Sequence, residues 1–154
     1  MKDFKDFDKA LKFVLKWEGF ISDDVRDSGG LTIWGISSKS YPKQVLEMKK
    51  IIDEERKDWK FEAFKIAEEI YYQNYWLKCG CQNMTYPLNL VVFDCAVNMG
   101  RRRAGELWEK SCGDWREFLL LRLYTYSKFK QAKIYFRGWA NRTLDLYKLI
   151  KEVK

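Results

Sequence analysis

The chain has 154 residues and a formal net charge of +7, with 47% hydrophobic and 33% charged side chains. This length and balance predict a folded domain with a substantial core and exclude a disordered or low-complexity protein. No apolar run approaches the roughly 18 residues that a membrane-spanning helix needs. The sequence also contains no histidine. It therefore excludes Ser-His-Asp and Cys-His triads and His-ligated catalytic metals, and carboxylate chemistry becomes the leading candidate for an enzyme.

The predicted elements begin with an amphipathic helix that ends near Glu18, because Phe4, Phe7 and Leu11 recur at steps of three and four residues. Residues 19–36 are rich in turn and strand formers and predict a small β-hairpin or β-meander. The remaining pattern predicts helices at 43–57, 61–76, 87–99, 103–110, 114–131 and 137–152. The segment 87–99 is apolar on nearly every face, which predicts a buried central helix. We therefore expect a mainly α fold, a helical bundle around this helix with a small N-terminal sheet.

The positive charge is concentrated at the C-terminal end of the chain. Residues 1–100 carry 15 basic and 16 acidic side chains, whereas residues 128–154 carry eight basic and two acidic ones. Such a field predicts an anionic partner, which is a nucleic acid, an anionic membrane surface or a polyanionic cell wall. A solvated basic face without a partner is the alternative.

The four cysteines, at positions 79, 81, 95 and 112, lack the paired spacing that is usual in zinc or redox motifs. Cys95 lies in an apolar stretch and is typical of a buried small hydrophobe. The first residues mix acids with bases and contain no apolar segment, so no signal peptide is predicted. We therefore expect synthesis in the cytoplasm with reduced thiols, and neither a metal nor another cofactor.

Three polar residues could together carry out glycosidic chemistry. Glu18 follows Trp17 at the end of the first helix, where apolar rings disfavour the ionised carboxylate and so favour a general acid. Asp27 lies in a polar, turn-rich segment that favours the ionised form, and Thr32 adds a hydroxyl. In this interpretation Glu18 protonates the leaving oxygen, while Asp27 and Thr32 orient a water or stabilise oxocarbenium charge. Taken singly, Glu18 is more typical of a surface residue and Asp27 of a turn former, and it is their spacing that favours a catalytic group.

The order and content of several segments resemble a known family. They include residues 13–19 (FVLKWEG), 27–37 (DSGGLTIWGIS), 92–100 (VFDCAVNMG) and 136–142 (FRGWANR), with Ile70-Tyr71, Tyr75-Trp76 and Ala104 between or near them. The chain is similar to the family-108 glycoside hydrolases, which are N-acetylmuramidases of phage lysis cassettes and of related bacterial secretion accessories. The spacing of Glu18, Asp27 and Thr32 also resembles that of phage-type lysozymes, with the last gap one residue shorter.

The resemblance implies a lysozyme-like fold over residues 1–154 and hydrolysis of the β-1,4 bond between N-acetylmuramic acid and N-acetylglucosamine. It assigns the family's catalytic glutamate to Glu18, with Asp27 and Thr32 as partners by analogy. Phe20 stands where the family's motif usually has a second glycine, which affects substrate fit more than chemistry. Residues 1–100 would form the catalytic portion, and residues 101–154 a basic portion with a peptidoglycan-binding role. The protein would reach the cell wall or periplasm after holin-type release.

Further residues are candidates for contact with the sugar chain. Tyr71, Tyr75 and Trp76 could stack on pyranose rings, although aromatic residues at helical spacing also form cores. Asp94 and Asn98 share one face of an apolar helix, so they either contact sugar or form a buried hydrogen-bonded pair. Trp139 lies in the basic C-terminal third, where Lys and Arg could meet the carboxylates of peptide stems or anionic headgroups.

Two other functions remain alternatives at this stage. One is a cell-wall-binding protein that kept the fold without catalysis. The other is a basic nucleic-acid-binding domain, suggested by Arg101, Arg102 and Arg103, although no recognisable reader motif accompanies them. The preferred interpretation is a monomeric enzyme whose partner is bacterial peptidoglycan, without specific binding of nucleic acid.

Overall fold

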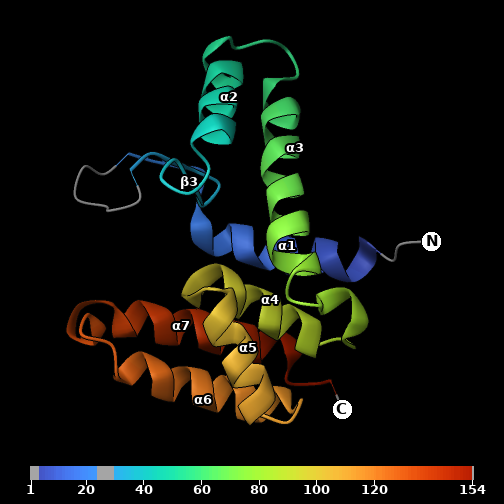
Figure 1. Ribbon diagram of the computed structural model, residues 1–154, viewed down its shortest axis with the longest axis vertical. Coiled ribbons are helices and arrows are strands. Elements are labelled where there is room, and N and C mark those ends of the chain that lie inside the picture. The colour runs from blue at the N-terminus through green and yellow to red at the C-terminus, as the bar shows by residue number, and fades with distance from the viewer. Residues whose placement is uncertain (1–3, 24–29, 154) are drawn as a thin grey trace. The chain divides into compact units, whose positions relative to one another are not determined.

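A computed structural model of the protein describes residues 4–23 and 30–153. Within these residues the chain forms seven α-helices and a small sheet (Figure 1). The elements are, in order, α1 (Phe4–Glu18), β1 (Ile21–Ser22), β2 (Thr32–Ile33), β3 (Ile36–Ser37), α2 (Pro42–Asp53), α3 (Trp59–Tyr71), a π-helical turn η1 (Tyr72–Leu77), a 3-10 turn η2 (Cys81–Asn83), α4 (Leu88–Met99), α5 (Arg101–Lys110), α6 (Trp115–Ser127) and α7 (Ala132–Ile150). Helices account for 72% of the residues that the structure describes, which confirms the predicted mainly α class.

The chain divides into two compact units. One unit contains Val14–Asn74, and the other contains Met1–Phe13 together with Tyr75–Lys154. The division falls within α1 and within η1, so it does not coincide with the change of charge near residue 100. The Val14–Asn74 unit contains ten basic and twelve acidic residues, and the other unit contains nineteen basic and ten acidic ones. The excess of positive charge therefore belongs to the unit that contains both ends of the chain.

The Val14–Asn74 unit combines the sheet with α2 and α3. The three strands form an antiparallel meander in the order β1-β2-β3, with Ile33 opposite Ile21 and Ile36. Pro42 occupies the first turn of α2, where its missing N–H has no helical partner to lose. The helices α2 and α3 lie side by side (Figure 1), and small residues of α3, Ala63 and Ala67, are fully buried. The predicted β-meander is therefore present, and it packs against α2.

The other unit is built around α4. Every residue from Asn89 to Ala96 is buried, as expected for a helix that is apolar on nearly all faces. Helices α5 and α6 pack against α4, and α7 packs against α6. The predicted central buried helix is thus confirmed.

Some predicted boundaries were wrong. α3 ends at Tyr71, where the chain continues as the π-helical turn η1, whereas the prediction extended the α-helix to residue 76. α6 ends at Ser127 and α7 begins at Ala132, five residues before the predicted start at 137. The prediction placed that start next to Gly138, but a glycine inside a helix costs only about 1 kcal/mol, which packing along a 19-residue helix outweighs.

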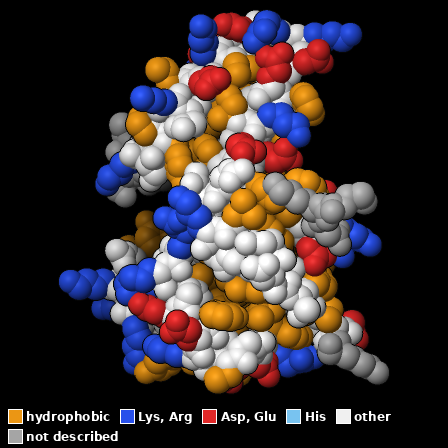
Figure 2. All heavy atoms as spheres, turned by 45° about the vertical axis from the view of Figure 1, so that its right-hand side comes forward, with side chains coloured by type: hydrophobic (Ala, Val, Ile, Leu, Met, Phe, Trp, Pro, Cys, Tyr) orange, Lys and Arg blue, Asp and Glu red, His pale blue; other side chains and the backbone are white. Residues whose placement is uncertain are grey.

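The surface of the Val14–Asn74 unit agrees with its composition. In the upper part of Figure 2, which contains α2 and α3, Lys and Arg side chains alternate with Asp and Glu side chains. Their opposite charges balance locally, which agrees with the nearly neutral composition of this unit. Among the described residues, none of the helices combines the length and apolar character that crossing a bilayer requires.

Candidate active site

Glu18 is the last residue of α1. The helix stops there because Gly19 adopts a left-handed backbone with φ +71°, which favours glycine, and the Gly19 N–H donates to the Leu15 carbonyl at 3.3 Å. The Glu18 side chain is half-buried. A carboxyl group is thus held at the rigid end of a helix while keeping access to solvent.

The hairpin turn between β2 and β3 packs directly against Glu18. Its two central residues, Trp34 and Gly35, both have positive φ, +46° and +77°, as in the tight turns that fit the twist of a hairpin. A Cβ placed on Gly35 would lie 2.8 Å from Cβ and 2.9 Å from Cγ of Glu18. Only glycine therefore allows the turn to approach the stem of the glutamate this closely.

Tyr71 holds the same turn from the α3 side. Its hydroxyl donates to the Trp34 carbonyl at 2.7 Å and would lie 2.7 Å from a Cβ on Gly35. The Tyr71 side chain is only 1% exposed, so it is a core residue and not a platform for a sugar ring. Of the two roles that the sequence left open for Tyr71, the structure therefore favours the core role. The sequence pattern did not predict the contact of Gly35 with Glu18 or the bond from Tyr71, although Trp34-Gly35 between two strand-forming pairs is a turn signal.

Thr32 lies on β2. Ile33 separates it from the turn. Thr32 pairs with Ser22 and Ser37 across the sheet, and its hydroxyl donates to the Ser22 carbonyl at 3.4 Å. The strand thus carries Thr32 on the same meander whose turn contacts Glu18. Asp27, the third residue of the predicted group, lies outside the described residues.

Phe20 is the large residue that follows Gly19, and its ring contacts show how the chain accommodates it. Its ring lies 4.8 Å from the Trp34 ring and 6.0 Å from the Trp59 ring, centroid to centroid. The phenyl group therefore extends an aromatic cluster beside the turn and leaves the backbone of Gly19 unobstructed. The departure from the family's motif adds apolar packing against the turn residue Trp34.

Asp94 and Asn98 belong to a buried polar network between α4, α6 and α7. The Asp94 carboxylate accepts from Arg122 Nη1 at 2.6 Å and from Arg142 Nη2 at 2.7 Å, and it is fully buried. Burial alone would raise the pKa of Asp94, but the two guanidinium groups outweigh it and hold that pKa below its ordinary value. Arg122 also donates to the Tyr126 hydroxyl, which in turn donates to Asn98. The structure thus favours the structural role for this pair over direct contact with sugar.

The remaining predicted contacts have different environments. Trp76 is 3% exposed and packs edge-on against Phe7 and Phe93, so it belongs to the core. Tyr75 is half-buried. Trp139 is also half-buried and lines a pocket on α7. Tyr75 and Trp139 therefore remain the accessible aromatic candidates.

The cysteines behave as thiols. All four are free, and Cys95 is buried in α4, where burial raises the pKa of its thiol to about 12. Within residues 4–23 and 30–153, no three His, Cys, Asp or Glu side chains gather in an arrangement that could hold a metal ion.

Helices around a buried central helix, with a small antiparallel sheet whose turn packs against a helix-ending glutamate, define a lysozyme-like protein. The structure of Brucella abortus SagA has the same fold, with a TM-score of 0.74, 22% sequence identity and coverage of 94% of this chain and 93% of that one. The family model of glycosyl hydrolase 108 matches residues 11–100. The chain belongs to the glycosyl hydrolase 108 family. No protein with curated annotation matches the sequence.

Membership of this family confirms the resemblance found in the sequence and makes the protein a glycoside hydrolase that acts on peptidoglycan. The matched region contains Glu18, Thr32 and the turn at Trp34-Gly35, and it ends at Gly100, directly after α4.

Proposed function

We propose that the protein is an N-acetylmuramidase that cleaves the β-1,4 bond between N-acetylmuramic acid and N-acetylglucosamine, with Glu18 as the general acid. The observation that carries this proposal is the packing of the Trp34-Gly35 turn against the stem of Glu18, with Tyr71 holding the turn in place. A general acid contributes only when its carboxyl is held in a defined position, and this packing restricts the side chain at Cβ and Cγ.

In the proposed reaction the protonated Glu18 donates its proton to the glycosidic oxygen as the bond to the leaving sugar breaks. A water molecule supplies the oxygen that ends on the anomeric carbon, and its proton passes to a carboxylate. We assign Asp27 and Thr32 to orienting that water or stabilising the oxocarbenium charge. Tyr75 is the proposed aromatic contact for the sugar chain.

The test is Glu18→Gln, which keeps the size of the side chain and removes the acid. We expect the rate of peptidoglycan solubilisation to fall by about 10²- to 10⁴-fold, the usual contribution of general acid catalysis. Mass spectrometry of the released muropeptides identifies the bond, since a muramidase leaves N-acetylmuramic acid at the new reducing end.

Glu47→Gln is the matched control, because Glu47 is an exposed glutamate on α2 in the same unit. It should clear peptidoglycan at the wild-type rate. Equal clearing by wild type and Glu18→Gln would contradict the assignment of Glu18. Binding of peptidoglycan without solubilisation by wild type would instead favour the cell-wall-binding alternative.

The setting of the reaction follows from the same proposal. An enzyme that cuts this bond lyses cells only after it reaches the wall, so we place it among the bacteriolytic endolysins, released from the cytoplasm through a holin-type pore. The expected observation is lysis of intact cells when the protein is coexpressed with such a pore, and slower lysis without it.

A further inference from the structure

A groove lies in the unit that contains the sheet, beside the turn that packs against Glu18. Its volume is about 450 Å³, within the range of roughly 300–1,000 Å³ that is typical of small-molecule sites. The residues that line it are Trp34 of the turn and Lys60, Phe61 and Phe64 of α3. Three of these four side chains are aromatic, and we refer to this feature as the aromatic groove.

The aromatic groove lies on the face of α3 that holds the turn. Phe61, Phe64 and Tyr71 are separated by three and seven residues, a spacing that places them on one side of a helix. Tyr71 bonds to the Trp34 carbonyl at 2.7 Å, and the Phe64 ring packs edge-on against the Trp34 ring at 5.3 Å, centroid to centroid. Ten residues of helix span about 15 Å, so the groove leads along α3 away from the turn at Glu18.

The rings of the groove differ in their exposure. Trp34 is only 7% exposed and is fixed between neighbouring rings, whereas Phe61 is 64% exposed. Phe20 supports Trp34 from the other side at 4.8 Å and is itself 39% exposed. Because the family's motif usually has glycine at the position of Phe20, this support is a feature of this chain. Exposed apolar rings that gather beside an active site indicate a binding surface.

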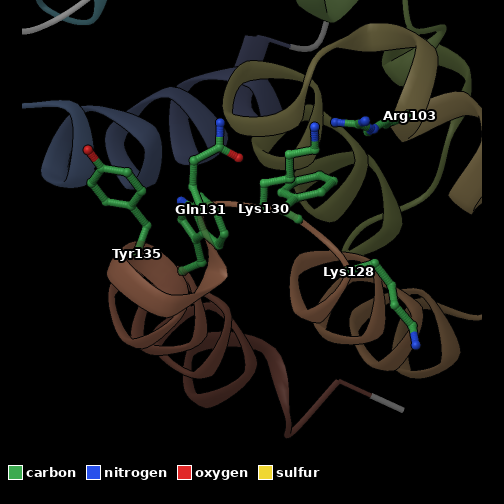
Figure 3. A pocket seen from close by; sticks show the side chains of 7 residues that line it. Arg103, Lys128, Lys130, Gln131 and Tyr135 are labelled. Atoms are coloured by element: carbon green, nitrogen blue, oxygen red, sulfur yellow. The ribbon is translucent and has the colours of Figure 1, made fainter.

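The aromatic groove differs in charge from the pocket on α7, in the unit that contains both chain ends. That pocket, beside Trp139, is also lined by Arg103, Lys128 and Lys130, and in Figure 3 the ends of Arg103 and Lys130 point toward one another. Among the described residues that line the groove, Lys60 is the one charged side chain. The pocket therefore concentrates positive charge, whereas the groove suits an uncharged ligand with an apolar surface.

We propose that the aromatic groove is a subsite for an N-acetylated sugar of the glycan strand that lies outside the two sugars joined by the cleaved bond. The inference rests on the proposed function in taking this glycan as the polymer. A pyranose ring presents C–H groups on its faces, and its N-acetyl group adds a methyl, so both pack on aromatic rings without any charge. Phe61 forms the open wall for this packing and Trp34 the fixed one. The subsite makes the enzyme favour long strands over short ones, and Phe20 strengthens that preference through Trp34.

The test measures binding of two uncharged probes to the full-length protein by calorimetry. The probes are the β-1,4-linked disaccharide and hexasaccharide of N-acetylglucosamine, which carry neither peptide stems nor carboxylates. Wild type should bind the hexasaccharide more tightly than the disaccharide. Phe61→Ala should reduce this preference about fivefold, the size expected for the loss of one aromatic contact. Phe61→Tyr keeps the ring and should retain the wild-type preference.

Leu46→Ala is the matched control, because Leu46 is a 72% exposed apolar residue on α2 that does not line the groove. It should leave the preference for the hexasaccharide unchanged. Phe20→Gly restores the residue of the family's motif and should reduce the preference, since Trp34 loses a neighbouring ring. Equal effects of Leu46→Ala and Phe61→Ala would overturn the proposal, as would a wild-type preference in Phe61→Ala. Equal melting temperatures for Phe61→Ala and wild type ensure that the change is not a loss of folding.

The outcomes separate this inference from the proposed function. Loss of hydrolysis in Glu18→Gln together with an unchanged preference in Phe61→Ala would refute the subsite alone. Hydrolysis of peptidoglycan by Glu18→Gln would refute the proposed acid and leave the binding comparison readable. The hexasaccharide contains no N-acetylmuramic acid, so its cleavage, detected by mass spectrometry of the calorimetry sample, would refute the proposed bond. The preference would then be measured in the Glu18→Gln background.

Discussion

At the scale of single residues, the position of Glu18 depends on a residue with no side chain. Gly35 permits both the positive φ of the turn and the contact with the glutamate stem. Tyr71 completes this group by bonding to the carbonyl next to Gly35. The Glu18 side chain is thus positioned by the hairpin and by α3 as well as by its own helix.

Gly35→Ala should therefore affect both stability and activity. The new methyl group would meet the Tyr71 hydroxyl and Glu18, and the left-handed backbone adds its own cost, so we expect a loss of about 2–4 kcal/mol in the free energy of unfolding. Urea denaturation measures this loss. Hydrolysis per folded molecule should also fall, because the methyl group displaces Glu18.

Gly113→Ala is the control for the backbone cost. Gly113 has nearly the same φ, +78°, but its added Cβ would meet only Leu88 Cδ2 at 3.9 Å. This variant should lose only about 1–2 kcal/mol and keep full activity per folded molecule. If the two variants lost equal stability and both kept full activity, the contact at Glu18 would have no functional importance.

At the scale of elements, helix beginnings differ in how they are capped. Asp114 precedes α6, and its carboxylate accepts from the N–H groups of Arg116 at 2.7 Å and Glu117 at 3.1 Å. Asp58 occupies the equivalent position before α3 but makes no such side-chain bond. The same residue type thus stabilises one helix through its side chain and not the other.

Asp114→Ala should lower the free energy of unfolding by about 1 kcal/mol, because two N–H groups at the helix start lose their acceptor. Asp58→Ala should change it by less than half of that. Thermal and urea denaturation of the two variants provide the comparison. A larger loss in Asp58→Ala would contradict this view of the two helix starts.

At the scale of the whole molecule, one buried carboxylate joins three helices. Asp94 of α4 pairs with Arg122 of α6 and Arg142 of α7, partners that are 28 and 48 residues away in the sequence. Removing the carboxylate leaves two guanidinium groups buried without their anion. This network also fixes Tyr126 behind the Trp139 side of the pocket.

Asp94→Asn should therefore lower the free energy of unfolding by about 3–5 kcal/mol near neutral pH. The pKa of Asp94 is lower in the folded protein than its ordinary value of 3.8, so its stabilisation is complete above that value and is lost as the pH falls through the folded-state pKa. Wild type should thus lose more stability than Asp94→Asn between about pH 5 and pH 2. Urea titrations at several pH values measure both effects.

Asp8→Asn is a suitable control because Asp8 is exposed on α1. It should follow the wild-type dependence on pH. Parallel curves for wild type and Asp94→Asn would show that the ion pairs do not contribute to acid sensitivity.

The sequence by itself determined the properties that depend on neighbours along the chain. Apolar spacing predicted α1, the all-apolar segment predicted the buried α4, and glycines with strand formers predicted the meander. Short motif segments in the family's order, from residues 13–19 to residues 136–142, indicated the family. These features follow from local backbone preferences, which a sequence displays directly.

Only the tertiary structure decided which polar and aromatic residues are buried. Tyr71 and Trp76 have the spacing of a sugar platform but lie in cores, and Asp94 has the position of a cleft residue but is enclosed by Arg122 and Arg142. The cations of the pocket likewise come from α5 and from the α6–α7 connection. A side chain's role depends on the partners that folding brings to it, and those partners lie tens of residues away, beyond the range of any local pattern.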